Sequence, residues 1–168
     1  FRDIITSDVV CRALKEKGKK GQVMFFWDDY DRLRKIPRGI PASFSEYIGM
    51  AISEVPDPYK CHKSYAEHFE KEFEEVVEKL GVDAKFISQY KMYKSNIYYP
   101  EIKEALQKRR DIDDILAKFR TEGRETKKKT AEEYYPLQIY CKSCKKSDKT
   151  EVTSYDGEDV ITYRCVCG

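Results

Sequence analysis

The chain has 168 residues, of which 40% are hydrophobic and 37% are charged. No apolar run approaches the roughly 20 residues that a membrane-spanning helix needs, so an integral membrane protein is excluded. Lys and Arg number 32 against 30 for Asp and Glu, so the net charge of +2 lacks the basic excess typical of nucleic-acid binders. The length allows one domain and a small appendage.

Residues 1–18 predict an amphipathic helix. Its apolar face carries Ile4, Ile5, Val9, Cys11 and Leu14. The chain begins with Phe1, and we expect it to start inside an element of a larger fold. No secretion signal is recognisable, so we expect a cytoplasmic protein whose six cysteines are thiols or metal ligands, because reducing conditions disfavour disulfides.

Residues 22–29 read as a short strand that is buried on both faces, which is typical of a parallel α/β sheet. Asp28, Asp29 and Asp31 follow where this strand should end, and ligand sites of such sheets lie at the carboxyl ends of strands. These carboxylates are candidates to pair with an ammonium group or to order Arg34. A turn that only caps the next helix is an equally good interpretation.

After an irregular stretch over 34–58, a capping box at Ser64 and Glu67 begins a helix that Gly81 ends. Residues 82–93 predict a second strand, and Pro100 opens two further helices that reach Phe119. Strand, helix and strand in succession predict a parallel crossover. The predicted fold class is therefore α/β, with a partial Rossmann-type sheet.

The segment 121–133 is almost devoid of apolar residues and predicts a solvated linker. Its lysines could contact RNA, but short charged runs are usually surface features.

Four cysteines near the end of the sequence form a CxxC and a CxC pair. They are Cys141, Cys144, Cys165 and Cys167. Two tight turns that each present two thiolates can bind one zinc ion tetrahedrally. The intervening residues alternate like a hairpin that turns at Asp156-Gly157, so we predict a zinc ribbon over 134–168.

A weaker cluster includes both histidines of the chain. It comprises Asp57, Cys61, His62 and His68. All four side chains are zinc ligands by type, but the spacing alone favours surface histidines and a small buried cysteine.

Three runs of sequence together resemble successive blocks of class I lysyl-tRNA synthetases. They are FFWDDYDRLRKIP, VPDPYKCHKSYAEHFEKEF and FISQYKMYKSNIYYPEIKEAL, and the two cysteine pairs follow them in the same order. The resemblance implies a Rossmann-type catalytic domain that activates lysine with ATP and Mg²⁺ and transfers it to lysine-specific tRNA. It also implies two structural zinc ions, one at each cluster.

On this basis we expect a partial catalytic domain over 1–120, with an embedded zinc loop at about 56–70. The linker then leads to a zinc-ribbon insertion. Both ATP-binding signatures of class I synthetases are missing from the sequence, and KMYKS at Lys91–Ser95 lies in the wrong half of the domain to replace one. We therefore expect a fragment that is inactive alone.

Two alternatives stay open at this point. The first is a non-enzymatic, zinc-dependent RNA-binding module that works through the ribbon and the linker. The second is a hydrolytic metalloenzyme that uses Asp57 and the histidines, which predicts an incomplete ligand shell with bound water.

Overall fold

The structure is a computed structural model that describes residues 1–119 and 134–168. The chain divides into two compact units, Phe1–Ser95 and Asn96–Gly168. The linker expected over 121–133 lies outside the described residues, and the domain limits taken from the sequence stay a prediction. Within the described ranges, no helix combines the length and the apolar character needed to cross a bilayer.

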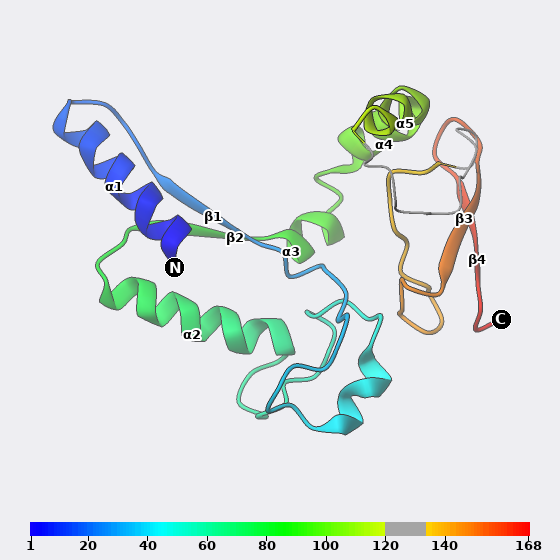
Figure 1. Cartoon of the computed structure of the whole chain (residues 1–168), viewed down its shortest axis with the longest axis horizontal. Helices are drawn as coiled ribbons and strands as arrows, with labels where there is room; N and C mark the ends of the chain where they lie inside the picture. The colour runs from blue at the N-terminus through cyan, green and yellow to red at the C-terminus, as the bar shows by residue number, and fades with distance from the viewer. Residues whose placement is uncertain (120–133) are drawn as a thin grey trace. The chain divides into compact units, whose positions relative to one another are not determined.

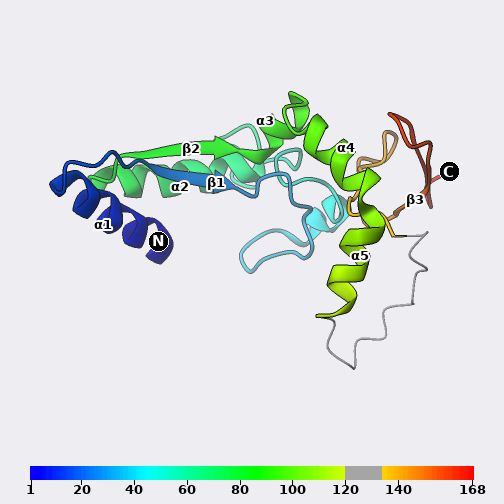
Figure 2. The same ribbon diagram turned by 90° about the horizontal axis from the view of Figure 1, so that it is seen from above.

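A two-stranded parallel sheet forms the centre of the first unit. Strand β1 (Val23–Trp27) pairs with β2 (Ala84–Ser88) so that Val23 lies opposite Ala84 and Trp27 opposite Ser88. The helix between them, α2 (Tyr65–Lys79), runs along the strands in both ribbon views (Figures 1 and 2). The predicted α/β class with a parallel crossover is confirmed.

Helices α1 (Arg2–Glu16) and α2 pack on one face of this sheet. The core that they share with the strands contains Ile4, Val23, Val77 and Val82. Phe73 of α2 extends it with ring contacts to Phe25 and Phe86, at centroid distances of 5.1 and 6.4 Å. Branched aliphatic and aromatic side chains from both strands thus face the helices.

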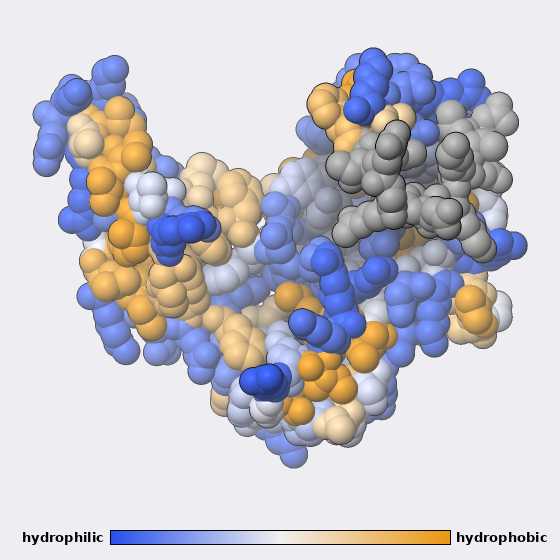
Figure 3. All heavy atoms as spheres, in the orientation of Figure 1, coloured by the Kyte–Doolittle hydropathy of each residue, from blue (hydrophilic) through white to orange (hydrophobic). Residues whose placement is uncertain are grey.

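The opposite face of β1 is open, since Met24 and Phe26 are 49% and 46% exposed. Burial of this strand on both faces, expected from its continuous apolar run, is therefore wrong for the described residues. In the space-filling view, hydrophobic side chains gather over α1 and the adjoining sheet (Figure 3). The exposed hydrophobic residues of α1 include Val9 and Val10.

The ends of α2 follow the predicted capping signals. The Ser64 hydroxyl accepts a hydrogen bond from the Glu67 amide at 3.1 Å, and the Glu67 carboxylate accepts one from the Lys63 amide at 2.7 Å. Gly81 has a φ of 68°, a left-handed conformation that glycine adopts without strain.

The second strand is shorter than the sequence predicts. It ends at Ser88, and residues 89–94 form helix α3 (Gln89–Lys94). The Ser88 hydroxyl accepts a hydrogen bond from the Lys91 amide at 3.1 Å, and the buried Asp29 carboxylate accepts one from the Tyr90 amide at 2.7 Å. The predicted strand over 89–93 is wrong, because Ser88 caps a helix there and the carboxylate of Asp29, from the turn after β1, accepts a further amide of its first turn.

The irregular segment that precedes α2 is pinned to the end of β1 by main-chain hydrogen bonds. It contains one 3-10 helix, η1 (Ala42–Tyr47). The Leu33 amide donates to the Met50 carbonyl at 2.8 Å, and the Ile52 amide donates to the Asp31 carbonyl at 2.9 Å. These bonds fix the loop that follows β1.

The second unit contains helices α4 (Tyr99–Gln107) and α5 (Arg109–Ala117) and an antiparallel hairpin. The hairpin strands are β3 (Thr150–Tyr155) and β4 (Ile161–Cys165), and their register shifts between Val152 and Ser154. At the turn, the Asp156 carboxylate accepts hydrogen bonds from the Glu158 and Val160 amides at 2.8 and 3.0 Å. The predicted hairpin is confirmed.

Glu70, on α2, makes the stability of the fold depend on pH. Burial, and then the negative charge of Asp29, raise the pKa of Glu70 to about 7. The folded state thus favours the protonated acid, so the fold loses stability as the pH rises through about 7. We expect Glu70→Gln to stabilise the chain at pH 8 by about 1 kcal/mol, discounted because the group is half exposed, and to have little effect at pH 4.

Denaturant unfolding at both pH values measures this difference. Glu78→Gln, at an exposed position of the same helix, is the matched control. An equal effect of Glu70→Gln at the two pH values would contradict the assignment.

Candidate metal centres

The four late cysteines converge at the base of the hairpin. Cys141 and Cys167 have their sulfur atoms 3.6 Å apart, and those of Cys144 and Cys165 are 3.7 Å apart. All four sulfurs lie within 4.8 Å of one another. A disulfide needs about 2.05 Å, whereas tetrahedral zinc with bonds of about 2.3 Å places its sulfur ligands about 3.8 Å apart. The cluster therefore has the dimensions of a zinc site.

Main-chain N–H groups favour the ionised form of one of these thiols, which is the form that binds a cation. The backbone N–H groups of Cys144 and Ser143 lower the pKa of Cys141 to about 6, so this sulfur favours the thiolate. Hydrogen bonding with its neighbours, Cys165 first, raises the pKa of Cys167 to about 12. Four thiols this close together cannot all ionise, because neighbouring thiolates repel one another. A bound divalent cation neutralises this repulsion, so that all four can become thiolates.

Hydrophobic burial around this cluster is small. Among the described residues after Asn96, the buried hydrophobic side chains are Leu106 and Cys141, and the ribbon contributes only the second. A module with so little core requires a covalent or metal staple in order to fold.

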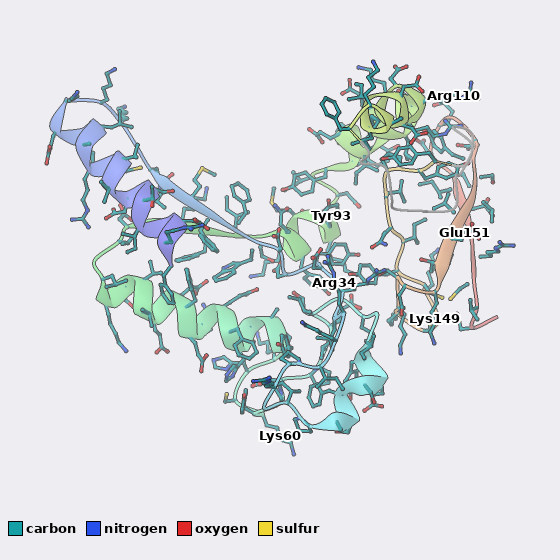
Figure 4. The ribbon with its side chains drawn as sticks, viewed as in Figure 1. Arg34, Lys60, Tyr93, Arg110, Lys149 and Glu151 are labelled. Atoms are coloured by element: carbon teal, nitrogen blue, oxygen red, sulfur yellow. The ribbon has the colours of Figure 1, made fainter. Side chains whose placement is uncertain are left out.

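A second cluster forms where the loop before α2 turns around the carboxylate of Asp57. This buried group accepts hydrogen bonds from the amides of Tyr59, Cys61 and His62 at 2.9, 2.8 and 2.7 Å. Burial opposes ionisation, but the three donors prevail and hold the pKa of Asp57 well below its usual range. Lys60, labelled in Figure 4, has a φ of 61° at the tip of this turn. Asp57 therefore shapes the loop that carries Cys61 and His62.

The ligand atoms of the second cluster lie around one point. The Cys61 sulfur is 3.2 Å from Nδ1 of His62 and 3.2 Å from Nδ1 of His68. Nδ1 of His68 lies 3.5 Å from Oδ1 of Asp57. One ligand atom from each of the four residues lies within 4.8 Å of the others. Tetrahedral zinc with mixed ligands places them about 3.3 to 3.8 Å apart, so this cluster also fits the ion.

Burial separates this arrangement from a pair of surface histidines. His68 belongs to the first turn of α2 and is only 7% exposed, and its ring stacks on Tyr59 at a centroid distance of 4.5 Å. The interpretation favoured by spacing alone, surface histidines with a buried cysteine, does not describe His68. Each cluster offers four protein ligands, as closed structural sites do, whereas a hydrolytic site keeps a position for water.

At the carboxyl end of β1, Asp29 is fully engaged by the protein. Its carboxylate accepts hydrogen bonds from the Tyr90 amide, at 2.7 Å, and from the Ser88 hydroxyl. Its main-chain carbonyl accepts a bond from the Ser53 hydroxyl at 2.7 Å. Asp29 thus joins three segments at the strand ends.

The other strand-end candidates face solvent. Arg34, labelled in Figure 4, donates to the Asp31 carboxylate at 2.9 Å, and their side chains are 71% and 61% exposed. Asp28 is also exposed. The structure therefore places these three side chains in solvent, unlike the buried Asp29.

Sequence reasoning missed an aromatic cluster at the same end of the sheet. The rings of Tyr30 and Tyr90 lie 5.5 Å apart, and the Lys94 ammonium lies over both, at 5.6 and 5.2 Å from their centroids. Glu54 pairs with Lys94 at 2.9 Å. Tyr93, labelled in Figure 4, contacts Tyr30 at 5.2 Å. Tyrosines that directly follow both strands in the sequence were the available sign of this cluster.

Comparisons with known proteins cover the whole chain. Residues 1–168 match the family described as tRNA synthetases class I (K). A lysine--tRNA ligase of Pyrococcus horikoshii is 41% identical over 165 residues, which cover 98% of this chain and 31% of the relative. Lysine--tRNA ligases of Treponema pallidum and Methanocaldococcus jannaschii are each 39% identical, over 170 and 169 residues. These matches cover 100% and 99% of this chain, and the chain spans 31% of the length of either relative.

A cysteine substitution tests the all-sulfur cluster. We expect Cys144→Ser to remove one bound zinc per chain and to unfold the hairpin, because zinc binding supplies on the order of 10 kcal/mol to such modules. Zinc content and amide hydrogen exchange in β3 and β4 measure the two effects. Ser143→Ala, at an exposed position between the two ligands, is the control, and a folded hairpin in Cys144→Ser would contradict the staple.

Substitutions at two neighbouring aspartates distinguish the buried, hydrogen-bonded Asp29 from the exposed Asp28. Asp29→Ala leaves the Tyr90 amide and the Ser88 hydroxyl without their acceptor, so we expect a loss of about 1 to 3 kcal/mol in the free energy of unfolding. Asp28→Ala should stay within about 0.5 kcal/mol of the unaltered chain. Chemical denaturation measures both, and equal losses would show that the Asp29 contacts contribute nothing.

Proposed function

The chain belongs to the family of class I tRNA synthetases for lysine, and on that premise we propose that the whole protein is a lysine--tRNA ligase. The observation that carries this proposal is the family match along all 168 residues. The chain spans less than a third of the relatives' length, so the proposed activity is that of the whole protein.

The proposed reaction has two steps. The carboxylate of lysine attacks the α-phosphate of Mg²⁺-bound ATP, which releases pyrophosphate and forms an adenylate. A hydroxyl of the terminal adenosine of tRNA then takes the lysyl group and releases AMP. Such phosphate chemistry depends on positioned cationic and hydrogen-bonding groups. Both class signatures that supply them are missing from these 168 residues, so we propose that the chain alone does not form the adenylate.

Within this reaction the residues of the chain act as a scaffold and as one wall of the substrate site. Asp29 fixes the ends of β1 and β2 relative to each other. We propose that the exposed residues at this end, Asp28, Asp31 and Arg34, contact the substrate, because such folds bind ligands at the carboxyl ends of parallel strands.

Both metal clusters take structural roles in the proposal. One zinc ion would be bound by Cys141, Cys144, Cys165 and Cys167, and the other by Asp57, Cys61, His62 and His68. Four protein ligands leave no coordination position for a reactive water. The partners of the whole protein are then lysine, ATP and lysine-specific tRNA, and its compartment is the cytoplasm.

Lysine-dependent exchange of pyrophosphate into ATP tests the activity. We expect the whole protein to catalyse this exchange with lysine and not with arginine, whose longer planar head group differs in shape and donor geometry. The 168-residue chain should show no exchange. A whole protein that binds tRNA but exchanges nothing would support the RNA-binding module instead.

Anomalous scattering at the zinc edge separates the ligase from the hydrolase alternative. We expect two ions in the chain, each with four protein ligands and no bound water. A single ion at Asp57 and the histidines with an open, hydrated position would contradict the structural assignment.

A further inference from the structure

The two imidazoles of the mixed cluster differ on their outer sides. Both His62 and His68 direct Nδ1 toward the Cys61 sulfur, at 3.2 Å. Nε2 of His68 lies 3.4 Å from Oε1 of Glu72. No described carboxylate makes the corresponding contact with Nε2 of His62. Of the two imidazoles, the ring of His68 therefore has a carboxylate close to its outer nitrogen, Nε2.

Helix geometry produces this contact. His68 and Glu72 are four residues apart on α2, so their side chains project from the same face, one turn from each other. The imidazole ring is itself fixed, since it stacks on Tyr59 and makes an edge contact with Phe69 at 4.9 Å. Glu72 thus approaches a ring whose orientation the protein has already set.

An imidazole that binds a metal through Nδ1 must carry its proton on Nε2. A carboxylate that accepts this N–H favours the correct tautomer, aims the ring and increases electron donation to the metal. Nε2 lies on the side of the ring away from the cluster, so Glu72 acts through His68 and does not itself reach the ion. The Glu72 side chain is 64% exposed.

We propose that Glu72 is a positioning residue of the mixed metal centre, which holds His68 in the tautomer that binds through Nδ1 and thereby slows loss of the metal. This inference rests on the proposed zinc site and adds a fifth residue to it. It also makes the two histidines unequal, with His68 the more strongly held ligand.

The competing interpretation is an ordinary pair on the helix surface. Such i,i+4 pairs contribute about 0.3 to 0.5 kcal/mol to helix stability and nothing to a metal. Alanine is the best helix former, so in Glu72→Ala its higher helix propensity offsets the loss of such a pair. Metal binding and helix stability therefore respond differently in the two interpretations.

Nitrogen NMR of the zinc-loaded chain reads the contact directly. The chain has two histidines, so His62 is an internal reference for His68. We expect both rings to show Nδ1 bound to the metal and a proton on Nε2, with slow solvent exchange only for His68. In Glu72→Ala the Nε2 proton of His68 should exchange as fast as that of His62.

Zinc transfer to a chromophoric chelator measures the consequence. We expect Glu72→Ala to lower the zinc affinity of the mixed centre by about 10- to 100-fold, as loss of such outer partners typically does. Glu72→Gln keeps an acceptor oxygen and should fall between Glu72→Ala and the unaltered chain. Glu75→Ala, at an exposed glutamate of the same helix, is the matched control and should change nothing.

Replacing zinc with cobalt shows which centre has changed. The charge-transfer absorption of cobalt differs in intensity between the mixed centre, with one thiolate, and the centre with four cysteines. Unchanged proton exchange and unchanged zinc transfer in Glu72→Ala would overturn the role of Glu72 and leave the zinc site intact. A chain that loads metal only at the four cysteines would overturn the mixed centre and the role of Glu72 together. Lysine-dependent exchange by the whole protein is a separate measurement, so the proposed activity survives either result.

Discussion

Two clusters of the chain bring thiol, imidazole and carboxylate groups together at distances that suit one bound metal ion. Four sulfurs lie within 4.8 Å of one another at the base of the hairpin, and a carboxylate, a thiol and two imidazoles do the same before α2. If the clusters bind zinc as proposed, the ion offsets repulsion among the ionised ligands, and folding and metal binding are coupled. This coupling matters most in the ribbon, where Cys141 is the only buried hydrophobic side chain among the described residues.

The two centres reach similar ligand geometry by different means. In the ribbon, two separate turns meet because β3 and β4 pair in antiparallel fashion. In the mixed centre, a single loop is wound around Asp57 by three amide donors, and the capped start of α2 adds His68. Asp57 therefore organises the loop, and its carboxylate also lies within 4.8 Å of the other three candidate ligands. The loop is ordered by hydrogen bonds even before metal contributes.

Hydrogen bonds to the buried carboxylate of Asp29 also organise the strand ends. Asp29 connects β1 to the start of α3 and to the irregular segment, and this fixes the edge at which a parallel α/β sheet binds ligands. One face of β1 carries the exposed side chains of Met24 and Phe26, whereas the other face is packed against α1 and α2. The unit thus combines a rigid, hydrogen-bonded edge with a sheet that is covered on one side.

The sequence alone determined the elements whose signals are local. Capping residues, glycine stops, hydrophobic periodicity and turn residues predicted α1, α2, the strands of the sheet and the hairpin, because each of these depends on residues close in sequence. The parallel pairing of β1 with β2 followed from the order strand, helix, strand. Only the tertiary structure decided that residues 89–94 are helical, since Asp29, from the turn after β1, accepts the Tyr90 amide beside the Ser88 cap. It also decided that His68 is buried beside Cys61 and backed by Glu72, because spacing does not tell which way a side chain points.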